Sequence, residues 1–138
     1  MLKQTALAVV LTLLFTSVAL AANYIDPPTL KKMLDQKQQV ILVDIQPADD
    51  FADQHLPGAI ETDAFPAKTD AQKARMDKAL PAIMASHAPV VVICPSGKTG
   101  AENGYAYLMT KGVPEPRLLI LKGGMNGWPY DQMVVKGR

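Results

Sequence analysis

The feature that most constrains this chain is an apolar run that ends at its only cysteine. Residues 90–93 are β-branched and apolar without interruption, which predicts a buried strand. The strand ends at Cys94, a short loop containing Gly97 follows, and a helical pattern begins at Gly100 and stops before Gly112. A buried strand that passes through a short loop into a helix is typical of α/β folds.

Two further runs, residues 40–44 and 117–121, are apolar except for Asp44 and Arg117, and they predict strands of the same kind. The first lacks polar alternation, which fits a parallel strand covered on both faces. Helical patterns separate the strands, and they cover residues 27–37, 47–52 and 70–84, with Asp26 as a helix cap and Pro81 ending or kinking the last. Strands that alternate with helices imply an α/β domain with a mainly parallel sheet.

The first 21 residues have the pattern of an export signal. Lys3 precedes a long apolar stretch, and Ala19-Leu20-Ala21 has the small-x-small form of a cleavage site. We therefore expect residues 1–21 to be a signal peptide, and residues 22–138 to form a single domain in the periplasm or outside the cell. The alternative is an uncleaved membrane anchor. The formal net charge of +1 gives no indication of a nucleic-acid partner or of binding to an anionic membrane surface.

Cys94 is the candidate nucleophile. Backbone N–H groups of the loop and of the first helical turn can converge beside it, and their partial positive charge favours a thiolate and bound anions. An exported chain normally pairs its cysteines, whereas this one has a single thiol, which indicates a reactive group or an intermolecular bridge. The alternative is a buried cysteine that only packs.

Two other polar residues are candidates for chemistry. His55 lies in the turn-forming stretch 55–60, where it is either a general base or a structural hydrogen-bonding residue, and we favour the second. Asp44 ends a predicted strand, and we expect it to fix the turn that follows. The glycine-rich stretch 122–128 allows close backbone approach, and Trp128 is interpreted as a core residue.

Three motifs in this order and spacing carry a resemblance to a known family. They are Val43-Asp44-Ile45 with Phe51 and His55-Leu56-Pro57-Gly58-Ala59, then Cys94-Pro95-Ser96-Gly97-Lys98-Thr99, then Leu121-Lys122-Gly123-Gly124 with Trp128. From about residue 25 to 128 the chain resembles the rhodanese-like domain. The resemblance implies a three-layer α/β domain, in which helices flank a central, mainly parallel sheet. Members that keep the cysteine typically transfer a sulfane sulfur through a cysteine persulfide.

The resemblance also implies a site. Cys94 is then the catalytic residue, and the substrate-binding residues are those of the loop, Pro95, Ser96, Gly97, Lys98, Thr99 and Gly100. The substrates would be a small anionic sulfur donor, such as thiosulfate, and a thiophilic acceptor, such as cyanide or a thiol. No metal or organic cofactor is needed, and no protein partner is indicated.

The chain departs from the family pattern because it lacks arginine residues that many members have. Many members have arginine where this chain has Gln46, and in the loop where it has Pro95 or Thr99, which leaves Lys98 as the only cation there. In having Ser96 and Thr99 at these two positions, the loop resembles that of the mercaptopyruvate sulfurtransferases, which carry serine and threonine there. The related phosphatases need arginine at the position of Gly100, which argues against phosphatase activity. The alternatives to an enzyme are a binding or sulfur-carrier module and an inert copy of the fold.

Overall fold

The computed structural model describes residues 21–138, so the predicted signal peptide lies outside the described residues except for Ala21. A parallel sheet forms the centre of the domain, with the strand order β1-β5-β4-β2-β3. The strands are β1 (Tyr24–Ile25), β2 (Ile41–Asp44), β3 (Ile60–Glu61), β4 (Val90–Ile93) and β5 (Leu118–Leu121). All of these pairings are parallel, so the carboxyl ends of the strands meet at one edge of the sheet, which is where α/β folds bind ligands.

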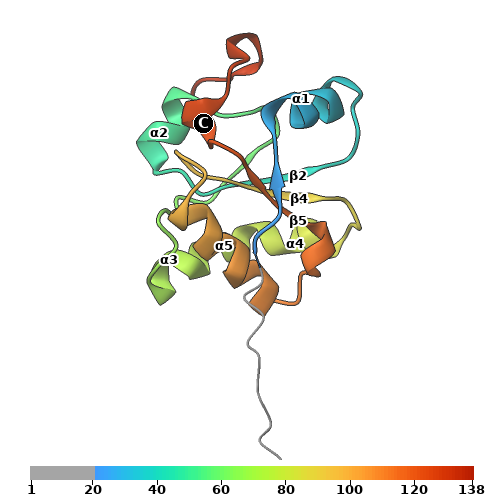
Figure 1. Ribbon diagram of the computed structural model, residues 1–138. Coiled ribbons are helices and arrows are strands. Elements are labelled where there is room, and N and C mark those ends of the chain that lie inside the picture. The colour runs from blue at the N-terminus through green and yellow to red at the C-terminus, as the bar shows by residue number, and fades with distance from the viewer. Residues whose placement is uncertain (1–20) are drawn as a thin grey trace, which may run out of the picture.

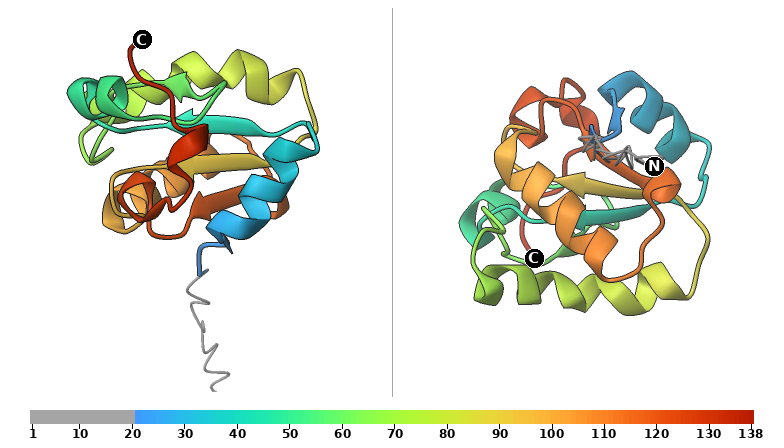
Figure 2. Two further views of the ribbon diagram at one scale, coloured as in Figure 1. Left: turned by 90° about the horizontal axis from the view of Figure 1, so that it is seen from above. Right: turned by 60° about the horizontal axis from the view of Figure 1, so that its bottom comes forward.

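Helices cover both faces of this sheet. They are α1 (Pro27–Asp35), α2 (Ala48–Asp53), α3 (Asp70–Arg75), α4 (Leu80–Met84) and α5 (Thr99–Thr110), with short 3₁₀ turns at Met76–Ala79, Glu115–Arg117, Met125–Gly127 and Asp131–Met133. Helices α1 and α2 lie on one side of the sheet, and α3, α4 and α5 lie on the other (Figure 1; Figure 2). This is the three-layer α/β arrangement that the family resemblance implied.

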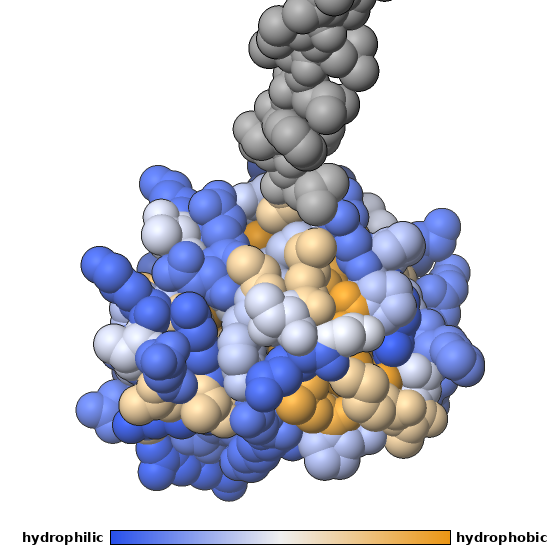
Figure 3. All heavy atoms as spheres, turned by 90° about the horizontal axis from the view of Figure 1, so that it is seen from below, coloured by the Kyte–Doolittle hydropathy of each residue, from blue (hydrophilic) through white to orange (hydrophobic). Residues whose placement is uncertain are grey.

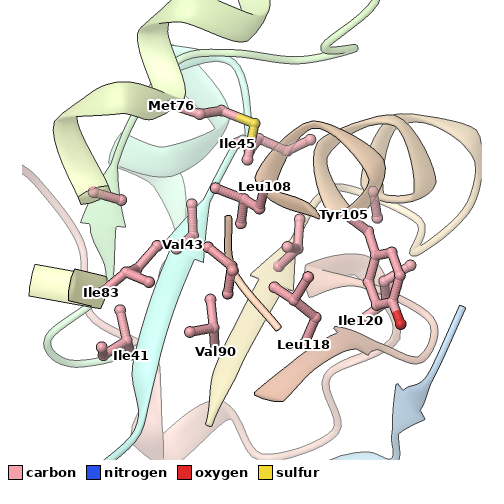
Figure 4. Packing of buried hydrophobic residues seen from close by; sticks show 14 of the residues in the cluster. Ile41, Val43, Ile45, Met76, Ile83, Val90, Tyr105, Leu108, Leu118 and Ile120 are labelled. Atoms are coloured by element: carbon pink, nitrogen blue, oxygen red, sulfur yellow. The ribbon is translucent and has the colours of Figure 1, made fainter. Parts of the chain in front are cut away.

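Alternate residues of each strand enter two separate cores, because successive side chains of a strand point to opposite faces. On the face covered by α3, α4 and α5, the strands contribute residues such as Val43, Val90 and Ile120, and Figure 4 shows them packed against helix residues such as Leu108. Leu42, Val91, Ile93 and Leu121 enter the opposite core with Leu30 and Trp128. Burial on both faces explains why the strands of this chain have no polar alternation.

The helix predicted over residues 70–84 is broken into three segments. Helix α3 begins at a capping box, in which Thr69 accepts a hydrogen bond from the Gln72 N–H, and its regular turns end at Arg75. The chain then tightens into a 3₁₀ turn over Met76–Ala79, before α4 begins at Leu80. Pro81 therefore lies in the first turn of a new helix, where its missing N–H costs no hydrogen bond, and it does not end the earlier one.

The face of the molecule that Figure 3 shows is mostly polar. Seen from below, hydrophilic side chains surround a smaller area of apolar ones near the start of the described chain (Figure 3). Within residues 21–138, no helix combines the length and the apolar character needed to cross a membrane.

Candidate active site

Cys94 lies at the carboxyl end of β4, at the start of the loop that leads into α5. Its side chain is 1% exposed. The backbone N–H of Gly97 donates a hydrogen bond to the Cys94 Sγ, at 3.0 Å. Gly97 has a φ of +69°, a left-handed conformation that glycine adopts without strain, and this conformation turns the chain back over the sulfur. A donor aimed at sulfur stabilises the negative charge of a thiolate or a persulfide.

The structure places the predicted loop residues around this turn. Ser96, Lys98 and Thr99 are exposed, Pro95 is half-buried, and Gly97 and Gly100 are buried. The sequence predicted that backbone N–H groups of the loop and of the first helical turn would converge beside the sulfur. Among the described residues, the hydrogen bond from Gly97 is the one that reaches it. Lys98 is exposed immediately before α5, so its ammonium group is available to an approaching anion.

The glycine-rich stretch after β5 holds the cysteine loop in place. Backbone N–H groups of Met125 and Asn126 donate to the carbonyl oxygens of Cys94 and Pro95, at 3.0 and 2.9 Å. Gly124 makes this approach possible. A Cβ atom at Gly124 would lie 2.3 Å from the Cys94 carbonyl oxygen, and the residue has a φ of +59°. The two segments therefore form one unit, and its geometry requires glycine at position 124.

At position 100, a different contact favours glycine over a residue with a side chain. A Cβ atom there would lie 2.6 Å from Cε2 of Phe65, a partly exposed aromatic side chain that packs over the start of α5. An arginine at this position, as in the related phosphatases, would therefore have to displace Phe65.

Asp44, the last residue of β2, and Gln46, in the turn that follows, form a buried polar pair. The Asp44 carboxylate is fully buried, and it accepts hydrogen bonds from the Gln46 backbone N–H, at 2.9 Å, and from the Gln46 Nε2, at 3.0 Å. The first of these bonds fixes the turn after β2, as the sequence predicted for Asp44. Burial raises the pKa of Asp44 from its ordinary value of 3.8 to about 6, although the two bonds from Gln46 oppose the rise.

We predict that Asp44 makes the folded protein less stable as the pH rises from about 4 to about 7. Between pH 3.8 and about 6 the folded state binds the Asp44 proton more tightly than the unfolded state does, so raising the pH favours unfolding. The free energy of unfolding should fall by about 3 kcal/mol relative to that of Asp44→Asn, which lacks this titration. Urea unfolding of both proteins at several pH values measures the difference. A pH-independent difference would contradict the raised pKa.

His55 has a structural environment. Its ring stacks on Phe51, with centroids 3.9 Å apart, and its Nδ1 lies 2.8 Å from the Phe51 carbonyl oxygen. Its backbone pairs with Val135 in an isolated antiparallel bridge. These contacts agree with the interpretation of His55 as a hydrogen-bonding residue and not as a general base.

A cavity of about 540 Å³ lies beside the cysteine loop, at the same edge of the sheet. Its lining comes from the turn after β2, from α2, from the loops after β4 and β5, and from the C-terminal segment, and it consists of Gln46, Asp50, Asp53, Gln54, Pro95, Asn126, Asp131, Val134 and Lys136. No sequence pattern indicates a role for residues 130–138. They reach this place because Val135 pairs with His55, and because the Gly137 N–H donates to the Ala52 carbonyl oxygen.

Comparison with known proteins identifies the family. The family model of the rhodanese-like domain matches residues 26–130, which is most of the chain. The chain belongs to the rhodanese-like domain family. The matched region includes the cysteine loop, the glycine-rich stretch and the turn after β2 that carries Asp44 and Gln46.

Solved structures of other rhodanese-fold proteins share the architecture. The thiosulfate sulfurtransferase from Pseudomonas aeruginosa is 23% identical, with a TM-score of 0.65 over 85% of this chain, although this chain spans only 20% of that protein. The BH2092 protein from Bacillus halodurans is 18% identical, with a TM-score of 0.64 and coverage of 83% of this chain and 77% of that one. The As-Sb reductase from Leishmania major is 15% identical, with a TM-score of 0.54 and coverage of 84% and 86%. At these identities the likeness confirms the fold, and proteins with different activities share it.

Proposed function

We propose that this rhodanese-like domain is a sulfurtransferase that carries a sulfane sulfur as a persulfide on Cys94. The observation that carries the proposal is the hydrogen bond from the Gly97 N–H to the Cys94 Sγ, at 3.0 Å, in a loop held by the glycine-rich stretch. A cysteine that only packs needs no donor aimed at its sulfur. The residues of the proposed site are Cys94 as nucleophile, and Pro95, Ser96, Gly97, Lys98, Thr99 and Gly100 as the binding loop.

In the first step the Cys94 thiolate attacks the outer sulfur of the donor. With thiosulfate, a bond forms between the Cys94 Sγ and this sulfur, the sulfur–sulfur bond of thiosulfate breaks, and sulfite leaves with the electron pair. The Cys94 persulfide anion remains, so the step needs no external oxidant. The Gly97 N–H stabilises the negative charge on sulfur.

In the second step a thiophilic acceptor attacks the outer sulfur of the persulfide. The bond between this sulfur and the Cys94 Sγ breaks, and Cys94 is released as a thiolate, ready for another donor. With cyanide the product is thiocyanate, and with a thiol it is the acceptor's persulfide. Each step exchanges one bond to sulfur for another, so no metal or organic cofactor takes part.

The experiment that tests this proposal measures thiocyanate. Purified protein, residues 22–138, is incubated with cyanide and with either thiosulfate or mercaptopyruvate as donor. We expect catalytic thiocyanate formation with at least one donor, at many turnovers per Cys94. No turnover with both donors would contradict an enzyme that acts on small donors.

A binding or sulfur-carrier module is the second candidate. The observation that favours it is the burial of Cys94, whose side chain is 1% exposed and so gives small molecules little access. A carrier would accept one sulfur from a donor and release it slowly to cyanide. Stoichiometric persulfide without turnover would therefore distinguish the carrier from the enzyme.

Lys98→Ala should weaken the use of an anionic donor more than it weakens folding. Lys98 is the exposed cation of the Cys94 loop, and its charge attracts thiosulfate. We expect the KM for thiosulfate to rise several-fold at low salt, and the free energy of unfolding to change by less than about 0.5 kcal/mol. Lys32→Ala, which removes an exposed lysine from helix α1, is the matched control and should leave the KM unchanged. Equal kinetics for the two variants would exclude this function of Lys98.

We propose that the protein acts outside the cytoplasm, as a single domain of residues 22–138. The support is the charged, apolar and small-residue pattern of residues 1–21. When the full chain is expressed in a bacterium, N-terminal sequencing of the periplasmic protein should begin at Ala22. Protein that stays in the cytoplasm with Met1 and the apolar stretch intact would be incompatible with export.

A further inference from the structure

The cavity beside the cysteine loop is acidic. Asp50 and Asp53 of α2 and Asp131 of the C-terminal segment line it, and Lys136 is the single basic residue of the lining. Within residues 21–138, no ion pair of 4 Å or less joins Lys136 to any of these carboxylates. Three carboxylates against one ammonium group give the cavity a negative potential, which attracts a cation and repels an anion.

Gln46 adds a buried acceptor to this cavity. Its side chain is 1% exposed, and its Nε2 donates to the Asp44 carboxylate and to the Gln54 carbonyl oxygen, at 3.0 and 3.1 Å. These two bonds orient the amide, so its Oε1 is the atom left for a ligand. No hydrogen bond to this oxygen is formed within the described residues. Every fully buried side-chain oxygen or nitrogen in residues 21–138 has a hydrogen-bond partner, so the Gln46 Oε1, which has none, is not fully buried. We infer that it faces the cavity, because the Gln46 side chain forms part of the cavity wall.

These features define the chemistry of the occupant. A carbonyl oxygen and carboxylates only accept hydrogen bonds, so the ligand must donate them. Within residues 21–138, no three histidine, cysteine or carboxylate groups lie close enough to hold a metal ion. An organic ammonium group supplies both the positive charge and the hydrogen-bond donors that these residues accept. A volume of about 540 Å³ suits a small molecule.

We propose that this cavity binds the ammonium group of the sulfur acceptor, and that the acceptor is a small aminothiol. The inference rests on the proposed sulfur transfer, whose second step needs a thiol next to the Cys94 persulfide. Pro95, the residue after Cys94, forms part of the cavity wall, so a ligand held there lies beside the cysteine loop. The donor fits this cavity poorly, because thiosulfate and mercaptopyruvate are anions and the three carboxylates of the lining repel them.

The transfer to an aminothiol is balanced without another reactant. The acceptor's thiol proton first passes to the outer sulfur of the Cys94 persulfide anion. The resulting aminothiolate sulfur then forms a bond to that outer sulfur, and the bond between the outer sulfur and the Cys94 Sγ breaks. Cys94 leaves as a thiolate, and the acceptor persulfide keeps the proton. The ammonium group does not react, and its contacts with Gln46 and the carboxylates hold the acceptor in place.

The test compares three thiols of similar size that differ in charge: cysteamine, 2-mercaptoethanol and 3-mercaptopropionate. Each is added to the purified Cys94 persulfide at low salt, and loss of the extra sulfur is followed by mass spectrometry. Their rates with a small-molecule persulfide correct for differences in intrinsic reactivity. We expect the corrected rates to follow the order cysteamine, 2-mercaptoethanol, 3-mercaptopropionate, and high salt to reduce the differences.

Two variants of equal charge locate the effect. Asp53→Asn with Asp131→Asn removes two carboxylates of the cavity, and it should lower the advantage of cysteamine over 2-mercaptoethanol by about fivefold, as expected for partly screened ion pairs. Asp49→Asn with Asp70→Asn removes two exposed carboxylates that do not line the cavity. This control should keep the wild-type advantage. Equal loss in both variants would mean that net charge, and not the cavity, selects the acceptor.

A binding measurement separates this inference from the proposed function. Ethylammonium has no thiol, and in an NMR titration it should shift the Gln46 side-chain amide resonances, whereas ethanol should not. If Cys94 forms no persulfide, the proposed sulfur transfer fails, although ethylammonium still identifies the cation site. If the persulfide forms but ethylammonium causes no shift, or the three thiols react at equal corrected rates, the acceptor subsite is wrong while the sulfur transfer stands.

Discussion

Cys94→Ser will abolish sulfur transfer to cyanide while the domain stays folded. The hydroxyl of serine is a far weaker nucleophile than a thiolate, and its product would lack the sulfur–sulfur bond that makes the outer sulfur transferable. We expect the rate of thiocyanate formation to fall by about four orders of magnitude or more, which is the loss seen when a covalent nucleophile is removed. The steady-state assay with thiosulfate and cyanide measures this loss.

The fold of this variant serves as its control. Serine is nearly isosteric with cysteine, and its Oγ accepts a hydrogen bond from the Gly97 N–H in place of the sulfur. The free energy of unfolding should therefore change by about 1 kcal/mol or less. Transfer activity that survives in a folded Cys94→Ser protein would show that the sulfur is carried elsewhere.

Gly124→Ala will disrupt the cysteine loop and destabilise the domain. The added Cβ atom would lie 2.3 Å from the carbonyl oxygen of Cys94 and 2.6 Å from that of Pro95, so one of the two segments must move. The backbone of Gly124, with φ of +59° and ψ of −164°, is also in a region that only glycine occupies readily. We expect the free energy of unfolding to fall by about 3 kcal/mol or more, with a severe loss of transfer activity.

Two neighbouring glycines provide matched controls. Gly127 has open space around a Cβ atom and lacks a positive φ, so Gly127→Ala should change stability by less than about 1 kcal/mol. Gly123 has a φ of +79° but its nearest contact is 3.5 Å away, so Gly123→Ala measures the backbone cost alone, about 1–2 kcal/mol. Urea unfolding of the three variants gives the comparison. If Gly124→Ala lowered the free energy of unfolding no more than Gly123→Ala does, close approach to the cysteine loop would not be the reason that position 124 requires glycine.

The parts of the fold that could be predicted from the sequence are those with a local signal. Uninterrupted apolar strands predicted a parallel sheet covered on both faces, and the strand that ends at Cys94 predicted the position of the candidate nucleophile. Helix α1 could be placed because Asp26 caps it and proline follows. Each of these signals acts over a few residues, and the structure confirms these placements.

The rest depends on contacts between segments distant in sequence. Gly124 requires glycine because it meets Cys94 and Pro95, which no pattern near residue 124 reveals. The acidic cavity forms only when the C-terminal segment pairs with His55 and brings Asp131 next to α2. The sequence shows that Gln46 replaces an arginine that many family members have. It does not show that the Gln46 Nε2 donates to Asp44 and Gln54, which leaves the Oε1 of this side chain for a ligand. Such features need the tertiary structure.

The most direct test of the central claim is the intact mass of the purified protein after treatment with thiosulfate. We predict a gain of one sulfur atom per chain, located on the peptide that contains Cys94 and removed by a reductant or by cyanide. The same treatment of Cys94→Ser should add nothing. A wild-type chain whose mass stays unchanged with both thiosulfate and mercaptopyruvate would contradict the account, and Cys94 would then be a buried residue that packs at the end of β4.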